Sequence, residues 1–133
     1  MESMTIGEVA RRASLRASAV RYYEKTGLLP TPPRIRGQRR YESSVLEHLA
    51  VISVAKGVGF RIDEIKQLFH GFRHGVPAFR RWHILAQRKL AELEELIVSA
   101  KQIKRLLRKA ESCKCLSLED CGRTLLKKRA PLT

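Results

Sequence analysis

Long apolar runs are absent from this sequence of 133 residues. No stretch approaches the ~20 consecutive apolar residues that a membrane-spanning helix requires. The segment Met1–Met4 leads into polar, helix-forming residues and does not resemble a signal peptide. The chain has only three cysteines, an odd number that does not suit a disulfide framework. We therefore expect a cytoplasmic protein that makes no contact with a membrane.

Acidic side chains are also scarce, with 13 Asp and Glu residues against 27 Lys and Arg residues. The formal net charge is +14, which opposes compaction but favours binding to a polyanion. No Ser/His/Asp set, phosphate-binding loop or carboxylate pair indicates catalysis. The length allows one domain, or one small domain with an extension. These features favour a nucleic-acid-binding protein over an enzyme.

The three cysteines lie within one short stretch, at Cys113, Cys115 and Cys121. Thiolates gathered this closely can hold one soft metal ion or an iron–sulfur cluster, or can be oxidised together. The alternative interpretation is three reduced, exposed thiols that are close only by chance. The first interpretation predicts a nucleic-acid-binding protein that carries a chemical sensor.

Two short helices are predicted near the N-terminus. Thr5 and Glu8 have the spacing of a capping box, which places a helix start at this point. Ser18 can cap a second helix, and Gly27 is well placed to end it. A break of about four residues separates the two helices, which is typical of a helix-turn-helix.

The segment 28–41 is expected to form a hairpin wing. Its prolines exclude a helix, and Gly37 offers a tight turn between two short basic arms. Four cations on so short and exposed a hairpin are more than solubility requires, so we expect them to contact DNA. These cations are Arg34, Arg36, Arg39 and Arg40.

Two further helices are expected after the wing. Ser43 or Ser44 can cap the first of them. Apolar periodicity predicts the second over residues 62–69. Glycines then indicate a hinge, in which His70 and His74 would be loop residues.

A long helix is predicted from about residue 78 to about residue 109, where Pro and Gly are absent. It would be roughly 48 Å long at 1.5 Å per residue, too long for a domain of this size to cover. Apolar residues recur at spacings of three and four and form a coiled-coil seam that needs a partner, most simply a second copy of the chain. The seam consists of Ala86, Leu90, Leu93, Ile97, Ala100, Ile103 and Leu107.

The segment Arg21–Leu29, with the sequence RYYEKTGLL, resembles the MerR family of transcription regulators. The QRRY motif at 38–41 and the opening TIGEVA at 5–10 also match. The resemblance implies a homodimer with winged helix-turn-helix domains and an antiparallel coiled coil, bound to a palindromic double-stranded promoter. It further implies that the activated regulator distorts the DNA so that RNA polymerase can read both promoter elements.

We therefore expect a mainly α fold with three parts. Residues 1–76 would form the winged helix-turn-helix DNA-binding domain, 77–110 the dimerisation helix, and 111–133 the cysteine effector loop and a loose basic tail that includes Lys127, Lys128 and Arg129.

The second helix of the helix-turn-helix should enter the major groove. Arg16, Ser18 and Arg21 lie near its leading face, and Arg21 can reach a guanine edge or a phosphate. The hydroxyls of Tyr22 and Tyr41 can donate to phosphate. With the four wing arginines, these residues make up the predicted DNA-contact set.

The cysteine pattern resembles the redox-sensing SoxR branch of the family, which implies a 2Fe–2S cluster held by four cysteines. Trp82 also matches a tryptophan of that branch. The fourth ligand would fall at Ala110, so this chain departs from the pattern. A cluster would need a ligand other than cysteine at that point.

Metal-sensing branches of the family offer a second comparison. Cys113 and Cys121 have the spacing of the copper sensors, and two thiolates suit monovalent copper, silver or gold. Cys115 would add a third thiolate, which suits mercury. Zinc prefers four ligands and would need a water or an imidazole, for which His83 of the partner chain is a candidate.

Two other functions stay open from the sequence. One is a constitutive DNA-binding regulator or architectural protein whose cysteines sense nothing. The other is a basic coiled-coil protein that binds RNA, against which the winged motif argues.

Overall fold

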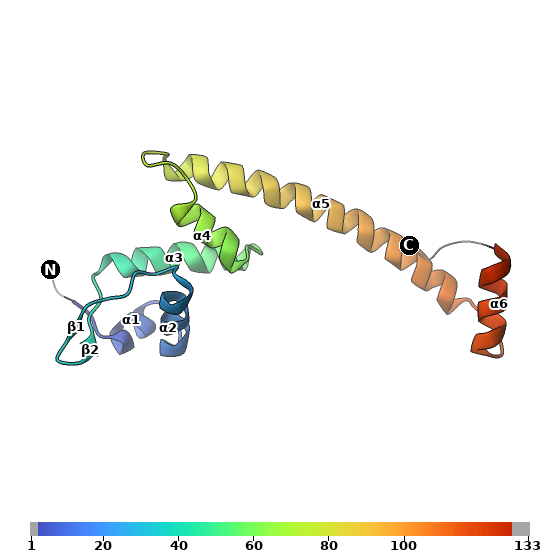
Figure 1. Cartoon of the computed structure of the whole chain (residues 1–133), viewed down its shortest axis with the longest axis horizontal. Coiled ribbons are helices and arrows are strands. Elements are labelled where there is room, and N and C mark those ends of the chain that lie inside the picture. The colour runs from blue at the N-terminus through green and yellow to red at the C-terminus, as the bar shows by residue number, and fades with distance from the viewer. Residues whose placement is uncertain (1–2, 129–133) are drawn as a thin grey trace. The chain divides into compact units, whose positions relative to one another are not determined.

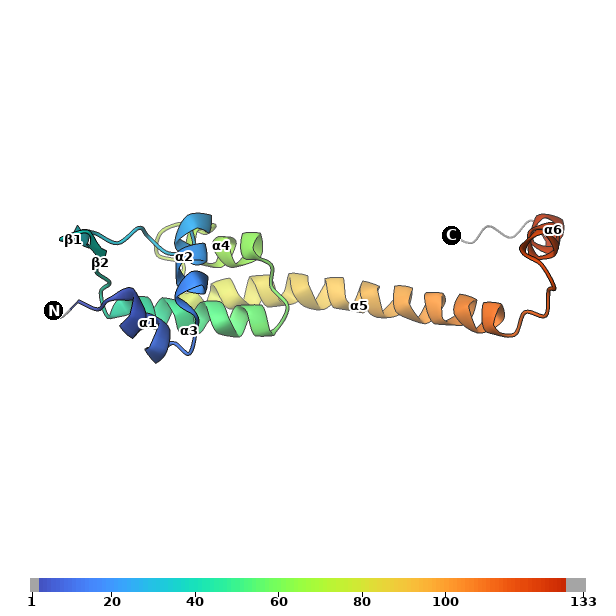
Figure 2. The ribbon, with the colours of Figure 1, turned by 90° about the horizontal axis from the view of Figure 1, so that it is seen from below.

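The computed structural model describes residues 3–128 and is mainly helical, as predicted (Figures 1 and 2). The chain divides into two compact units, and the boundary between Gln87 and Arg88 falls inside the longest helix. None of the helices within residues 3–128 combines the length and apolar character needed to cross a bilayer. In chain order the elements are α1 (Ile6–Arg12), α2 (Ala17–Thr26), β1 (Arg34–Ile35), β2 (Gln38–Arg39), α3 (Ser44–Gly57), α4 (Ile62–His70), α5 (Ala78–Glu111) and α6 (Leu118–Lys128).

The core of the first unit is formed by apolar side chains from α1 to α4 and the start of α5. Burying one of its Val, Leu, Ile, Phe or Met side chains contributes about 1.5–3 kcal/mol relative to leaving that side chain exposed. The largest fully buried side chains are Val9, Val20, Leu29, Leu49, Ile52 and Ile65.

α1 begins with the predicted capping box. The backbone N–H of Glu8 donates to Thr5 Oγ1 at 3.2 Å, and the N–H of Thr5 donates to the Glu8 carboxylate at 3.5 Å. The predicted cap of α2 is wrong, because Arg16 occupies the N-cap position and Ser18 lies inside the helix. Gly27 ends α2 as predicted, in the left-handed conformation (φ 88°) that favours glycine.

The wing is the predicted hairpin, at one edge of the first unit (Figure 1). Arg34 pairs with Arg39 and Ile35 with Gln38 in an antiparallel register. The two turn residues have positive φ, 54° at Arg36 and 81° at Gly37, as a tight two-residue hairpin requires.

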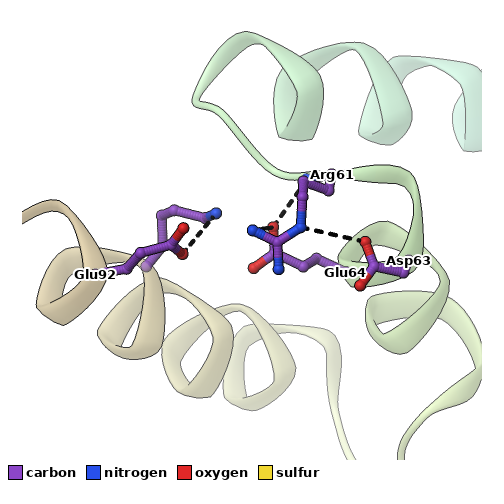
Figure 3. A network of polar contacts seen from close by, with 5 residues as sticks. Arg61, Asp63, Glu64 and Glu92 are labelled. Atoms are coloured by element: carbon purple, nitrogen blue, oxygen red, sulfur yellow. Dashed lines mark hydrogen bonds and ion pairs between the residues drawn. The ribbon is translucent and has the colours of Figure 1, made fainter. Parts of the chain in front are cut away.

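The helices after the wing follow the predicted order with local differences. Ser43 is the N-cap of α3, but its side chain makes no capping hydrogen bond. His70 is the last residue of α4, so its prediction as a loop residue is wrong, whereas His74 lies in the turn that follows. Arg61 steadies the start of α4, since its guanidinium lies 3.4 Å from Asp63 and 3.7 Å from Glu64 (Figure 3).

The Arg81 side chain holds the predicted hinge between α4 and α5 in place through hydrogen bonds. Arg81 donates hydrogen bonds to the carbonyl oxygens of Leu68, Phe69 and Val76, at 3.2, 3.1 and 2.9 Å. Its guanidinium also lies 5.7 Å from the centre of the Phe72 ring. Carbonyls at the end of α4 that lack helical partners are thus satisfied by a cation from the next helix.

The second unit consists of the remainder of α5 together with α6. α5 has 34 residues, which corresponds to about 51 Å, and Lys89 donates to Glu92 at 3.0 Å along it (Figure 3). α6 was not predicted, and it places Lys127 and Lys128 in a helix instead of a loose tail. Arg129 and the residues after it lie outside the described part.

Candidate nucleic-acid interface and cysteine cluster

One face of α2 carries the predicted DNA-reading residues. Arg16, Ser18, Arg21 and Tyr22 are all exposed, while Val20 packs into the core on the opposite face. An α-helix presents one stripe to the core and leaves the other for a partner, so the exposed stripe is free to enter a groove. The structure therefore brings four of the predicted contacts together on one accessible surface.

The two neighbouring tyrosines of α2 have different environments. Tyr22 is half exposed, with 50% of the residue's surface accessible. Tyr23 is buried, and the ammonium of Lys56 lies 5.7 Å from the centre of its ring. Tyr22 is thus available to a partner, whereas Tyr23 belongs to the core.

The tip of the wing is exposed and positively charged. Arg34 and Arg36 are exposed, and Arg34 donates to the carbonyl oxygen of Gly37 at 3.3 Å across the turn. Gln38 is exposed beside them and was not among the predicted DNA-binding residues. Amide side chains also bind phosphate and sugar oxygens, which is the signal that would have included Gln38.

The base of the wing differs from its tip, because its side chains are engaged within the protein. Arg40 donates to Ser3, at 2.9 Å to the hydroxyl and 2.9 Å to the carbonyl oxygen. Arg39 donates to Glu24 at 3.1 Å, and the hydroxyl of Tyr41 donates to the other oxygen of the same carboxylate. Tyr41 is buried, which corrects the expectation that its hydroxyl faces phosphate.

The buried position of Tyr41 also changes its acidity. Burial raises the pKa of the phenol well above its usual range, and the hydrogen bond with Glu24 adds to the rise. The phenol is therefore a proton donor to Glu24 over the whole physiological pH range. In the sequence Glu24 is visible only as part of the RYYE motif, and nothing in that motif reveals its role as the shared acceptor.

The cysteine cluster lies in the second unit. Cys113 and Cys115 belong to the loop after α5, and Cys121 lies on the first turns of α6. The three sulfur atoms all lie within 4.8 Å of one another. Ser117 caps α6 by accepting from the N–H of Asp120 at 3.1 Å, which fixes the point where the loop becomes helix. The capped turn thereby brings Cys121 back toward the other two thiols.

The thiols of the loop have different acidities. The backbone N–H of Cys115 donates to the sulfur of Cys113 at 3.4 Å, and this hydrogen bond lowers the pKa of Cys113. The hydrogen bond between the two side chains raises the pKa of Cys115 to about 11. Cys113 is therefore the first of this pair to become a thiolate, the form that binds metals.

The spacing of the sulfur atoms suits a single metal ion. Thiolates bound to one ion at about 2.3 Å lie roughly 3.8–4.6 Å apart, depending on geometry. The three sulfurs need only small movements to reach such distances. Within residues 3–128, no other group of three His, Cys, Asp or Glu side chains has this arrangement.

Three other residues were expected to bear on the cysteine site, namely Ala110, His83 and Trp82. Ala110, at the position where the fourth ligand of an iron–sulfur cluster would fall, is exposed near the end of α5 and offers no ligand atom. His83 is exposed on α5 in the first unit, and its role as a partner's ligand stays a prediction. Trp82 packs edge-on against Phe60, with ring centres 6.1 Å apart, and is part of the fold of the first unit.

Comparison with known proteins identifies the family. Residues 4–71 match the family model for MerR HTH family regulatory proteins, and residues 46–110 match the model described as MerR, DNA binding. The regulator CueR of Yersinia pestis is 34% identical over 122 residues, which cover 89% of this chain and 86% of CueR. A homologue of the activator SoxR from Chromobacterium violaceum is 29% identical over 120 residues, covering 90% and 81%.

A solved structure shows the same arrangement of elements. The regulator PbrR691 from Ralstonia metallidurans, crystallised with lead(II), superimposes with a TM-score of 0.72 at 28% identity. The match covers 86% of this chain and 90% of that one. These relatives are transcription regulators and not enzymes. The chain accordingly belongs to the MerR family and is a DNA-binding transcription regulator with a C-terminal cysteine cluster.

Proposed function

We propose that this regulator senses a thiophilic metal ion bound by the thiolates of Cys113, Cys115 and Cys121. The observation that carries the proposal is the mutual approach of all three sulfur atoms to within 4.8 Å. Soft thiolate ligands select soft ions, and three of them suit Hg(II) or Pb(II). The lead(II) complex of PbrR691 supports this choice, since that protein shares the fold.

Two alternatives use the same cysteines differently. A two-thiolate site for Cu(I) would need only Cys113 and Cys121, and it leaves the third nearby sulfur without a role. A 2Fe–2S cluster is favoured by the similarity to a SoxR homologue, but it needs four ligands and the structure groups three. The three-thiolate ion uses every sulfur of the cluster.

We further propose that the exposed face of α2 and the tip of the wing contact promoter DNA. The contact residues would be Arg16, Ser18, Arg21 and Tyr22 in or beside the major groove, and Arg34 and Arg36 at phosphates. Metal binding would stabilise a form of the regulator that bends and untwists the promoter for RNA polymerase.

The proposed assembly is a homodimer joined along α5. Leu90, Leu93 and Ile97 are 59%, 42% and 53% exposed, although they form the predicted seam. Ile103, a further seam residue, is also exposed, and the exposed Leu96 beside the seam widens the apolar stripe. A stripe of this length on an exposed helix needs a second helix to cover it.

Charges beside the seam favour an antiparallel pair. If Ile97 of one α5 meets the partner's Ala100, then Glu94 approaches the partner's Lys101. The same pair forms twice by symmetry, and each is worth about 0.2–1 kcal/mol. In a parallel pair Lys101 would instead face an apolar position.

A charge exchange tests this orientation. Lys101→Glu alone should weaken an antiparallel dimer about fivefold, because it places like charges opposite each other. The double variant with Glu94→Lys should restore the dissociation constant measured by sedimentation equilibrium. No effect of Lys101→Glu would contradict the antiparallel alignment.

Transcription in vitro tests the sensor. The promoter is found by selecting duplexes from a random library with the purified protein, and Hg(II), Pb(II) and Cu(I) are then added separately. Cys113→Ser and Cys121→Ser should abolish the response and leave DNA binding almost unchanged. Loss of response in Cys115→Ser supports three thiolates, whereas retention supports two.

The same preparations separate the remaining alternatives. Protein purified without oxygen that is coloured and contains two irons per chain would indicate a cluster instead of a single ion. A full response in all three variants would mean that the cysteines do not sense, as in a constitutive regulator.

A further inference from the structure

The carboxylate of Glu24 joins the recognition helix α2 to the wing. Its side chain is only 7% exposed. One oxygen accepts from Arg39 of β2 at 3.1 Å, and the other accepts from the hydroxyl of Tyr41, directly beyond the wing. Both oxygens are thus used by residues 15 and 17 positions away along the chain.

A buried carboxylate in this position constrains its neighbours strongly. Removing it from water is unfavourable unless donors replace the lost hydration. Here a guanidinium and a phenol supply those donors. Any movement of the wing away from α2 would leave the carboxylate unpaired, so the pairing resists such movement.

The strands of the wing are too short to fix its orientation by themselves. Each of its strands, Arg34–Ile35 and Gln38–Arg39, has only two residues. A two-stranded hairpin of this size is not stable by itself. At its base, Arg40 is held by Ser3, and Tyr41 and Met4 exchange backbone hydrogen bonds of 2.8 Å. These interactions fix the base to the N-terminal segment, while the carboxylate of Glu24 ties it to α2.

We propose that Glu24 is a positioning residue that sets the distance and angle between α2 and the wing. Arg39 and Tyr41 act through Glu24 and not on DNA. The inference rests on the proposed DNA contacts of α2 and the wing tip, because the consequence for function is the spacing between them. A duplex would then be bound only where its groove and its flanking phosphates match that spacing.

Two measurements on the full-length protein test the proposal with Glu24→Gln. Glu42→Gln is the matched control, since Glu42 is exposed and loses the same charge two residues beyond the wing arginines. The first measurement needs no DNA: the initial rate of trypsin cleavage after Arg36, relative to cleavage after Lys101. We expect Glu24→Gln to raise this ratio at least about tenfold, through local release of the wing, and the control to leave it unchanged.

The second measurement is ethylation interference on the palindromic duplex selected by the wild type. Glu24→Gln should lose interference at phosphates flanking each half-site and keep protection of the guanines bound by α2. The slope of log K against log salt should shrink by about one for each phosphate that the wing no longer binds. General destabilisation would instead weaken interference at all positions together.

Unchanged cleavage and an unchanged interference pattern in Glu24→Gln would overturn the proposal. If that variant loses its helical circular dichroism, Tyr41→Phe decides by the same measurements. It keeps the ion pair with Arg39 and should raise the cleavage ratio about threefold. Absence of flanking interference in the wild type would contradict the proposed DNA contacts, while the cleavage ratios would still test the positioning role of Glu24.

Discussion

The two units of the chain differ in how much of their apolar surface they cover. Within residues 3–128, all 16 buried apolar side chains lie between Met4 and Leu85, in the first unit. Among the described residues of the second unit, Lys89 alone is buried, and large apolar side chains such as Leu107 and Leu126 are more than 60% exposed. The first unit therefore has a core of its own. The second unit depends on partners, which are the proposed second chain and the proposed metal ion.

The largest expected effect comes from Leu93→Glu. In the proposed dimer this substitution buries a charge without a partner in the α5 seam, at a cost of about 3–5 kcal/mol. The protein should become monomeric by light scattering and should no longer hold a two-half-site duplex. Val98→Glu, at an exposed position of α5 outside the predicted seam, should stay dimeric. A dimeric Leu93→Glu variant would show that the seam is placed wrongly.

A smaller effect is expected when one apolar side chain in each unit is shortened and the free energy of unfolding is measured. Ile52 is fully buried in the first unit, so Ile52→Ala should lower the free energy of unfolding by about 2–5 kcal/mol. Leu126 is 78% exposed on α6, and Leu126→Ala should change the free energy of unfolding by less than about 0.5 kcal/mol. Urea unfolding followed by circular dichroism measures both. Similar losses would mean that α6 is covered in the assembled protein.

Removing one arginine from each unit should affect DNA affinity differently. Arg21→Ala on the exposed face of α2 should weaken binding to the selected duplex by about 1–3 kcal/mol. Arg105→Ala removes the same charge from α5 and should cost much less. Fluorescence anisotropy at several salt concentrations measures both. Equal losses would indicate that net charge alone governs binding.

The smallest effect concerns the pH dependence of stability. The pKa of Tyr41 is raised in the folded protein, so the folded state holds this proton more tightly than the unfolded state. Its contribution is fully present below the unfolded pKa of about 10 and is lost as pH rises above it. The stability difference between wild type and Tyr41→Phe should be constant from pH 7 to 9 and should narrow at higher pH. A constant difference up to pH 11 would contradict the raised pKa.

Several features governed by neighbours in sequence were predictable. The capping box at Thr5, the stop at Gly27 and the turn at Gly37 each depend on a few adjacent residues, and all three are confirmed. The long helix was predictable because its apolar spacing extends over many turns. Local chemistry specifies these elements before any tertiary contact forms.

Features governed by distant contacts were not predictable. An exposed arginine on a hairpin looks like a DNA-binding residue, and only the position of Glu24 shows that Arg39 is engaged within the protein. α6 was missed because Gly122 lies within it and costs about 1 kcal/mol of helix stability. The sequence placed Cys121 near the other cysteines, but the helical turn that begins at Ser117 determines how closely the thiols approach.

The most direct test of the sensor is the number of sulfur atoms around a bound ion. Hg(II) is added at one equivalent per chain to the full-length protein, and the sulfur coordination number is measured by X-ray absorption. Our account predicts about three sulfurs in the wild type and about two in Cys115→Ser, with operator binding retained in both. Two sulfurs in the wild type, unchanged by Cys115→Ser, would contradict the three-thiolate site.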